Sequence, residues 1–532
     1  MEMARPKGSL PSWSVLTQTA SVRREIDCKT PSNSGYKRAE VIDSAESALR
    51  MNFLSRAGSL GIVRCALAFR LAGCAANQPY HLGEAPTETA VTPAGSGSVK
   101  DIYRLGFIEF DEQGDFWDRD QLRKTVQAIR DTGRGILLVT YIHGWQNNSN
   151  STDAADIGQF RSLLALLTAD QTVQMSGLQV FGVYLGWRGR VVHKVNPVVD
   201  ALTWVGKEAS FYSRKNAATR ISSSTPITEA IFTLIKTARR DTPGNSRCVV
   251  IGHSFGALVL EKALAQALVG TLLYEAPFAP GVEKSRADRV FKPADLILLV
   301  NSAAESIYSK EMIDMYRDTT PLRGAPHVIA ISSDADMATG LAFPIGTKLS
   351  NVPKLLSGSF RKYQGDGRET SQFNYFTQTP GHNDSVQSHR LVLVRKGKSD
   401  LGLDPFDLNL KNPGGSYENV TLYTGTRYDW TQWQIERQGP NQTNYWVLRV
   451  PKQIIPGHGP IFEGESRDLM AALFRLATKP EASERPVPLK VRGSAEGPVQ
   501  KTEQRLQRVQ ATGERVVTPV QPNASDRHPP QH

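Results

Sequence analysis

The 532-residue sequence contains only four cysteines, Cys28, Cys65, Cys74 and Cys248. Four cysteines at these spacings form neither a disulfide framework nor a metal-binding cluster, so we expect neither kind of cross-link to stabilise the fold. Cys248 lies inside an apolar run and is most simply explained as a small buried core residue.

The sequence also lacks a long uninterrupted hydrophobic run and a basic stripe in its central part. The apolar stretch at 57–69 contains Arg64, which makes it too short and too charged for a conventional membrane span. The net charge is +11, of which +5 falls within residues 1–74 and +3 within 478–532. Only +3 remains for the centre, which argues against nucleic acid as a partner.

The stretch from Arg247 to Leu264 joins two apolar segments through a glycine–serine turn. Residues 248–251 are typical of a strand buried in a parallel sheet, and residues 255–269 are apolar nearly all round, as in a buried helix. Between them, Gly252-His-Ser254-Phe-Gly256 fits the G-x-S-x-G nucleophile elbow. A turn this sharp strains the serine backbone, and glycines on either side avoid side-chain collisions. Ser254 is therefore the candidate nucleophile.

This stretch resembles the α/β-hydrolase family, in its serine esterase and lipase branch, and the resemblance covers about residues 101–477. It implies an α/β fold with a doubly wound, mostly parallel sheet and helices on both faces. It also implies a triad in the chain order serine, acid, histidine, with no cofactor and no metal. Carboxylic esters are the expected substrates by analogy with the fold's commonest chemistry.

A second buried strand, at 135–142, ends in the pair His143-Gly144. Esterases that this chain resembles place an oxyanion loop at the corresponding point. Gly144 would let the backbone approach the substrate, so that the amide of Trp145 points at the developing oxyanion. The amide of Phe255 would be the second donor. We expect His143 to be structural and bonded to backbone near this loop, because as a base it would precede the nucleophile.

The strand expected at 327–331 is followed by two aspartates that compete for the role of triad acid, Asp334 and Asp336. The family carries its acid at the carboxyl end of this strand. We prefer Asp336, because a loop residue a few positions beyond the strand has room to curl toward the base. Asp334 is the alternative, and its other expected role is to cap a turn or the next helix.

The last strand is expected at 445–450, and His458 follows it, flanked by glycines, before a helix at 466–476. This is the place at which the family holds its base, so His458 is preferred and His382 is second. His253 adjoins the nucleophile, but its side chain is expected to point to the opposite side.

The domain organisation follows from changes in composition along the chain. Residues 1–50 and 478–532 are polar and aperiodic and are expected to be disordered. Residues 75–100 resemble a flexible tether, which leaves 101–477 as the folded domain. Within it, 188–225 and 340–442 interrupt the alternation of strands and helices. The first is expected to be an insertion over the site. The second is expected to be a cap or an elaborated insertion before the last strand, with short strands at 391–394 and 420–423.

Residues 51–74 have the order of a secretory signal, a basic start followed by an apolar run and Leu71-Ala-Gly-Cys74. The last four residues resemble a bacterial lipobox. This resemblance implies cleavage before Cys74, acylation of that cysteine and a protein anchored to the cell envelope. Arg64 and Arg70 interrupt the pattern, and the alternative is a short amphipathic helix ahead of a cytoplasmic domain.

The sequence thus predicts a serine hydrolase in which His458 and Asp336 activate Ser254 for attack on an ester carbonyl. Two other functions remain open at this point. One is a non-catalytic envelope protein of the same fold that binds partners. The other is an amidase, peptidase or acyltransferase that uses the same triad.

Overall fold

The structure is a computed structural model that describes residues 77–91, 101–150, 155–190, 204–275, 294–319, 326–345, 347–348, 355, 360–365, 368–401, 419–439 and 443–478. All of them belong to one compact unit, Ala72–His532. The expected disordered ends and the expected signal at 51–74 lie outside the described residues, so these predictions stay untested.

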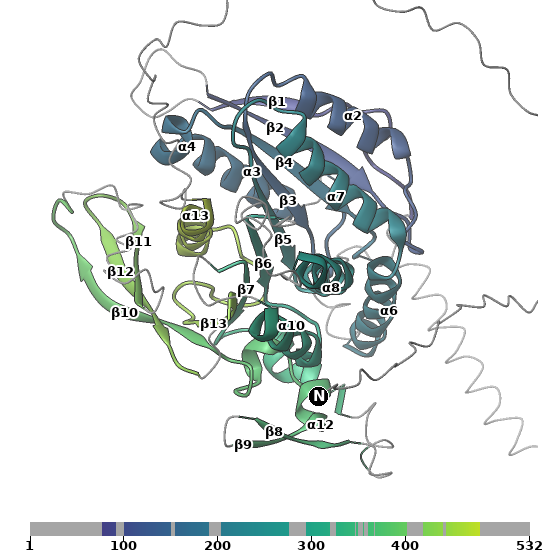
Figure 1. Ribbon diagram of the computed structural model, residues 1–532, viewed down its shortest axis with the longest axis vertical. Coiled ribbons are helices and arrows are strands. Elements are labelled where there is room, and N and C mark those ends of the chain that lie inside the picture. Colours follow the sequence, from purple (N-terminus) through teal and green to yellow (C-terminus); the bar gives the residue numbers. More distant parts are fainter. Residues whose placement is uncertain are drawn as a thin grey trace, which may run out of the picture. The chain divides into compact units, whose positions relative to one another are not determined.

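An eleven-stranded sheet runs through the described domain in the order β1-β2-β4-β3-β5-β6-β7-β13-β10-β12-β11 (Figure 1). The strands from β2 to β10 in this order pair in parallel, and the two ends of the sheet are antiparallel. The bounds are β1 Thr87–Val91, β2 Asp101–Glu109, β3 Ile136–Ile142, β4 Gln179–Gly186, β5 Arg247–His253, β6 Leu296–Val300, β7 Val328–Ser333, β10 His389–Gly397, β11 Asn419–Gly425, β12 Trp430–Arg437 and β13 Tyr445–Val450.

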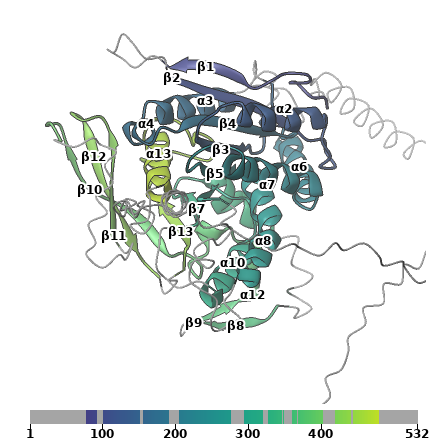
Figure 2. The same ribbon diagram turned by 45° about the horizontal axis from the view of Figure 1, so that its top comes forward.

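Helices cover both faces of this sheet (Figures 1 and 2). Buried side chains of α2, α6, α7, α8 and α10 form one apolar core with the sheet, and those of α3 and α13 form the other. The bounds are α2 Arg119–Arg130, α3 Ala155–Thr168, α4 Gln171–Met175, α6 Trp204–Ser222, α7 Thr225–Arg240, α8 Phe255–Glu275, α10 Ser306–Thr319, α12 Gln372–Thr377 and α13 Gly464–Thr478, with a π-helix η1 Ala338–Ala342, a 3₁₀ helix η2 Pro380–His382 and a separate hairpin β8 Lys362–Gly365 and β9 Arg368–Ser371.

The central strands form because their sequences are apolar without alternation. Every residue of β3, β4, β6 and β7 is buried, as expected for strands covered by helices on both faces. Helix α2 shows the 3.6-residue period, with Leu122, Val126 and Ile129 facing the core. An α/β architecture with a large, mostly parallel sheet is therefore confirmed.

The region 340–442 does not form a cap throughout, and in this respect the prediction is wrong. Its strands β10, β12 and β11 continue the main sheet beyond β13, which places the last strand of the chain inside the sheet. The short strands expected at 391–394 and 420–423 lie within β10 and β11, whereas β12 was missed. The hydrophobic signal is weak here because β10 is exposed over most of its length after Leu391, including Leu393 and Val394.

Two further boundaries differ from the expectation. The supposed tether at 75–100 contains β1, which pairs antiparallel with β2 from Thr87 opposite Leu105 to Val91 opposite Asp101. The supposed insertion at 188–225 contains α6, whose apolar and polar residues lack a clear period. Tertiary packing rather than local pattern fixes both elements, since Ala217, Ala218 and Ile221 of α6 are buried in the core.

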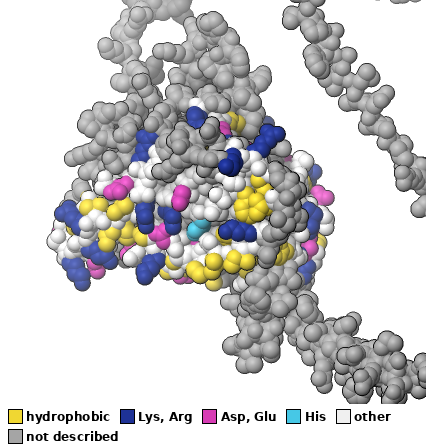
Figure 3. Space-filling model, turned by 90° about the horizontal axis from the view of Figure 1, so that it is seen from below, with side chains coloured by type: hydrophobic (Ala, Val, Ile, Leu, Met, Phe, Trp, Pro, Cys, Tyr) yellow, Lys and Arg dark blue, Asp and Glu magenta, His cyan; other side chains and the backbone are white. Residues whose placement is uncertain are grey.

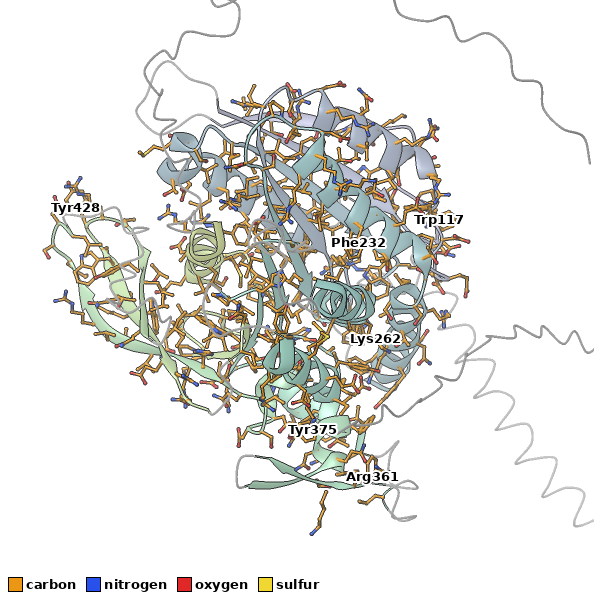
Figure 4. The ribbon with its side chains drawn as sticks, in the orientation of Figure 1. Trp117, Phe232, Lys262, Arg361, Tyr375 and Tyr428 are labelled. Carbon is orange, nitrogen blue, oxygen red and sulfur yellow. The ribbon has the colours of Figure 1, made fainter. Side chains whose placement is uncertain are left out.

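The surface of the domain carries charges of both signs. In the view of Figure 3, Lys and Arg side chains lie beside Asp and Glu, with hydrophobic patches between them. Tyr428, at the turn between β11 and β12, is 62% exposed (Figure 4). Among the described residues, no helix is long and apolar enough to cross a membrane. Cys248 is a buried free cysteine, as expected.

Helix α8 carries a carboxyl group into the core between α10 and β13. Glu261 is 4% exposed, and its Oε1 accepts hydrogen bonds from Ser309 Oγ (2.7 Å) and Tyr445 OH (3.0 Å). The next residue, Lys262 (Figure 4), lies with Nζ 4.9 Å from the Tyr308 ring. Burial is the largest influence on Glu261 and raises its pKa from 4.5 to about 7.

We predict that Glu261→Gln makes stability less dependent on pH. Between pH 4.5 and 7 the unfolded state releases the Glu261 proton and the folded state keeps it, so rising pH destabilises the wild type. Gln keeps the acceptor oxygen without the charge. In urea unfolding, the stability of the variant relative to wild type should rise by roughly 2–3 kcal/mol between pH 5 and pH 8. If the difference in unfolding free energy between Glu261→Gln and wild type stays the same from pH 5 to pH 8, Glu261 is not a buried, protonated carboxyl in the folded state.

Candidate active site

Ser254 stands between β5 and α8 in a backbone conformation that side chains rarely adopt, with φ of 55°. Its amide donates to Val300 O (2.9 Å) on the neighbouring strand β6, and its carbonyl accepts from Leu258 N (3.1 Å) at the start of α8. The strained turn that the sequence predicts is therefore present. The flanking bonds hold the hydroxyl at the carboxyl end of the parallel sheet.

Glycines make this turn possible because backbone crowds it. A Cβ at Gly256 would lie 2.1 Å from Ile142 O and 2.6 Å from His143 O, at the end of β3. A Cβ at Gly252 would lie 2.6 Å from Ala257 Cα. All three distances fall far below any tolerated contact, so α8 can approach β3 and β5 this closely only with glycine at 252 and 256.

A continuous chain of hydrogen bonds runs from Ser254 to Asp336 through His458. The Nε2 atom of His458 lies 2.8 Å from Ser254 Oγ, and its Nδ1 atom lies 2.9 Å from each carboxylate oxygen of Asp336. The three residues follow β5, β7 and β13, whose carboxyl ends lie at one edge of the sheet. Residues more than 200 positions apart in the sequence are thus brought into contact.

Asp336 is held as a buried carboxylate. It is 2% exposed, and Oδ1 accepts hydrogen bonds from Ala338 N (3.0 Å) and Thr339 N (3.2 Å), while Thr339 Oγ1 donates to Oδ2. Burial raises the pKa of this carboxyl, but His458 and Thr339 outweigh burial and hold the pKa below its ordinary value of 3.8. Asp336 therefore stays ionised where the His458 imidazole needs an acceptor.

The two alternatives lie in other surroundings. Asp334, two residues before Asp336, forms ion pairs with Arg449 Nε (2.9 Å) and Arg390 (3.3 Å) on neighbouring strands. His382 in η2 bonds Thr379 Oγ1 through Nδ1 (3.0 Å). The structure therefore brings Asp336 and His458 to Ser254, and it places Asp334 with arginines on the sheet.

The loop after β3 lies directly against Ser254, the candidate nucleophile. A Cβ at Gly144 would fall 2.8 Å from Ser254 Cβ, so no larger residue fits there. The ring of the next residue, Trp145, packs edge-on against Phe211 of α6 at 5.5 Å. Phe255 opens α8, and the first amides of a helix have no partner within it. Among the described residues, neither the Trp145 nor the Phe255 amide donates to a loop or turn carbonyl.

His143 has the structural role that the sequence predicts. Trp187 N donates to its Nε2 (3.1 Å), which leaves the proton on Nδ1 to be donated to Gly144 O (2.9 Å). The ring is fully buried and stacks on Trp187 at 5.6 Å. Burial is the largest cause that lowers its pKa to about 4, so this histidine is neutral and fixes the loop.

Two residues near the site depart from the sequence analysis. The His253 ring does not point away, because its Nε2 lies 2.8 Å from His458 O. Asn301 was missed, although it follows the buried strand β6 and has φ of 47°. An asparagine directly after a buried strand, next to the elbow strand, was the available signal, since Asn tolerates this conformation.

Comparison of the chain with protein-family models, with curated proteins and with solved structures gave no match. Among the described residues, no group of three or more His, Cys, Asp or Glu side chains is placed to hold a metal ion. The argument for function therefore rests on the geometry of the site.

We predict that Gly256→Ala destabilises the protein by about 1–3 kcal/mol, because the new methyl group must push α8 away from the carbonyls of β3. The measurement is the free energy of urea unfolding. Gly158→Ala in α3 is the matched control, since nothing lies within 4 Å of a Cβ there and helical alanine is favoured. Equal stability of the two variants would show that the close approach at Gly256 is absent.

Proposed function

We propose that the protein is a serine hydrolase of the α/β-hydrolase fold that cleaves carboxylic esters. One observation carries the proposal: Ser254, on a strained elbow, is hydrogen-bonded to His458, which is hydrogen-bonded to the buried carboxylate of Asp336. The chain order serine, acid, histidine and the placement after β5, β7 and β13 support it. Esters are proposed because this fold most often cleaves them, a step by analogy.

In the first half-reaction, His458 Nε2 takes the hydroxyl proton as Ser254 Oγ attacks the ester carbonyl carbon. Asp336 accepts a hydrogen bond from Nδ1–H, which fixes the imidazole tautomer and stabilises the imidazolium that forms. The amides of Trp145 and Phe255 receive the negative oxygen of the tetrahedral intermediate. The intermediate then collapses, the carbon–oxygen bond to the alcohol breaks, and His458 returns the proton to the leaving alkoxide.

In the second half-reaction, water replaces the alcohol. His458 Nε2 takes a proton from that water as its oxygen attacks the acyl carbon bound to Ser254 Oγ. The second intermediate uses the same two amides. Its collapse breaks the bond to Ser254 and returns the proton to Oγ, so a carboxylic acid leaves and the enzyme is restored. Every proton and electron pair is accounted for by residues of this chain and water.

The first functional prediction concerns the triad. Ser254→Ala, Asp336→Asn and His458→Ala should each lower kcat on p-nitrophenyl esters by at least about 10³-fold, because each removes one member of a unit that acts together. Steady-state kinetics on purified full-length protein, with folding checked by circular dichroism, is the measurement.

The matched controls are Asp334→Asn and His382→Ala, the residues whose partners lie elsewhere. Both should keep kcat within a few-fold of wild type. A folded Ser254→Ala variant with full turnover would eliminate the serine mechanism. A larger loss from Asp334→Asn than from Asp336→Asn would transfer the acid role to Asp334.

The segment that follows Asp336 has an unusual distribution of side chains. Met337, Leu341 and Ile345 are 65%, 50% and 52% exposed, and their spacing puts them on one face of the helical turns that include η1. Thr339 and Thr347 face inward and are buried. The inward face also carries the buried Phe343, so large apolar groups lie on both faces, whereas an amphipathic helix normally exposes polar side chains.

This exposed face supports an apolar acyl group in the substrate. It begins one residue after Asp336, and π-helical turns such as η1 occur frequently at functional sites. Phe343 of the same segment packs beneath Lys215 Nζ of α6 at 4.4 Å, and Phe211 of α6 packs on Trp145. Phe211 also packs on Phe255, the residue after Ser254, at 4.9 Å, so apolar side chains lie beside the elbow, where a hydrocarbon chain would be desolvated.

We predict that Leu341→Ser selectively impairs hydrolysis of long-chain esters. The variant should lose roughly tenfold in kcat/KM on p-nitrophenyl decanoate and little on the acetate, because each buried methylene contributes about 0.8 kcal/mol. Leu393→Ser on β10, where the residue is 44% exposed, is the control and should change neither rate. An unchanged decanoate-to-acetate ratio in Leu341→Ser would remove the apolar face from the substrate site.

A further inference from the structure

Two consecutive carbonyl groups at the base accept hydrogen bonds from buried side chains. His458 O accepts from His253 Nε2 (2.8 Å) and from Asn301 Nδ2 (3.1 Å). Gly457 O accepts from the same Asn301 Nδ2 (3.2 Å). These bonds reach the backbone of the very residue whose imidazole contacts Ser254. We call the pair His253 and Asn301 the carbonyl clamp.

The loop that carries His458 is anchored in the core on both sides, by Ile454 and Ile455 before the histidine and by Ile461 and Phe462 after it. It lies between β13 and α13, outside regular secondary structure. A Cβ at Gly457 or Gly459 would meet nothing within 4 Å, so the neighbours of the histidine offer no packing. Between these buried anchors, the residues directly beside His458 add no packing, and the hydrogen bonds to the Gly457 and His458 carbonyls hold this part of the backbone.

Asn301 is suited to tie this loop to the strand that leads to the acid. Its side chain is fully buried, and Oδ1 accepts from Ser333 N (3.0 Å) while Nδ2 donates to the two loop carbonyls. A carboxamide supplies one acceptor and two donor hydrogens, which matches these three partners. Asn301 has a left-handed backbone conformation with φ of 47°, which is less favourable than an ordinary turn conformation. Such a conformation persists where the surrounding structure requires it.

His253 is locked in one tautomer by the same carbonyl. Since His458 O can only accept, His253 Nε2 carries the proton, and Nδ1 has no hydrogen-bond partner among the described residues. The residue is 2% exposed, and burial is the largest cause that lowers its pKa to about 3. A neutral donor beside His458 adds no positive charge that would oppose formation of the imidazolium.

We infer that the carbonyl clamp positions the His458 imidazole between Ser254 and Asp336, so that His253 and Asn301 are positioning residues for the reaction. The inference rests on the proposed function. The clamp joins four segments that meet only in the folded state: the elbow, the end of β6 that carries Asn301, the strand β7 leading to the acid, and the base loop. Small displacements of a catalytic group lower rates steeply, up to about 10²-fold for 1 Å. The clamp therefore acts on kcat through the geometry of His458.

Variants that remove only the donors test this inference in the full-length protein. His253→Leu removes one donor, whereas His253→Gln keeps an amide nitrogen near the former Nε2 position. Asn301→Asp keeps the acceptor for Ser333 N and tolerates the positive φ, but it loses the donors. We expect kcat to fall about tenfold in His253→Leu and Asn301→Asp and about 10²-fold in the double variant, with KM within two-fold and substantial rescue in His253→Gln.

The control for general damage to the core is His327→Leu. His327 is a buried histidine whose Nε2 donates to a carbonyl, Ala294 O (2.8 Å), away from the triad. It should lower thermal stability without lowering kcat. Wild-type kcat in both clamp variants, or an equal loss of kcat in His327→Leu, would overturn the inference.

A second readout does not depend on turnover. The His458 Nδ1 proton that faces Asp336 should give a low-field proton NMR resonance that is assigned by its loss in His458→Ala. We expect this resonance to shift or broaden in the double clamp variant and to keep its wild-type position in the His253→Gln variant. If the wild type hydrolyses no ester, the proposed function fails. The position of this resonance is then the only test of whether the carbonyl clamp positions His458. An unchanged resonance in the folded double variant would then overturn it.

Discussion

The contact between the His458 imidazole and the buried Asp336 carboxylate is the interaction on which the site depends. A carboxylate is costly to bury, and here His458 together with the amides and hydroxyl of Ala338 and Thr339 offsets that cost. The same contact fixes which imidazole nitrogen faces Ser254. Without it the nucleophile would keep its elbow but lose the acceptor for its proton.

Backbone strain gathers at the edge of the sheet where this contact lies. Among the described residues, three non-glycine residues have positive φ, Gln146, Ser254 and Asn301, and they follow the adjacent strands β3, β5 and β6. Such conformations persist only where the surrounding structure fixes them. Strands that are buried over their whole length provide this rigidity, so the core and the site are linked energetically.

The parts of the fold with a strong local signal were predictable. Runs of apolar residues gave the central strands, and β13 was placed at 445–450 as observed. The elbow could be predicted because close backbone contacts require glycine at 252 and 256, and this requirement gives the G-x-S-x-G pattern in the sequence. The preference for Asp336 over Asp334 came from loop geometry, and in the structure it is Asp336 that faces His458.

Other features depend on contacts between distant segments and leave little local trace. The pairing of β1 with β2 and the extension of the sheet by β10, β12 and β11 arise from tertiary packing. The orientation of His253 is set by a carbonyl 205 residues away. The exposed apolar face of the segment after Asp336 was equally hidden, because Met337, Leu341 and Ile345 resemble a buried face until their exposure is known.

The central claim is that Ser254 is a nucleophile activated by His458. Incubation of the purified protein with a fluorophosphonate, followed by peptide mass spectrometry, tests it most directly. We expect one phosphonyl adduct, on Ser254 in the peptide that contains His253 and Gly256, and strongly reduced labelling of His458→Ala. An unlabelled wild type, or an adduct on another serine with Ser254 unmodified, would contradict the claim.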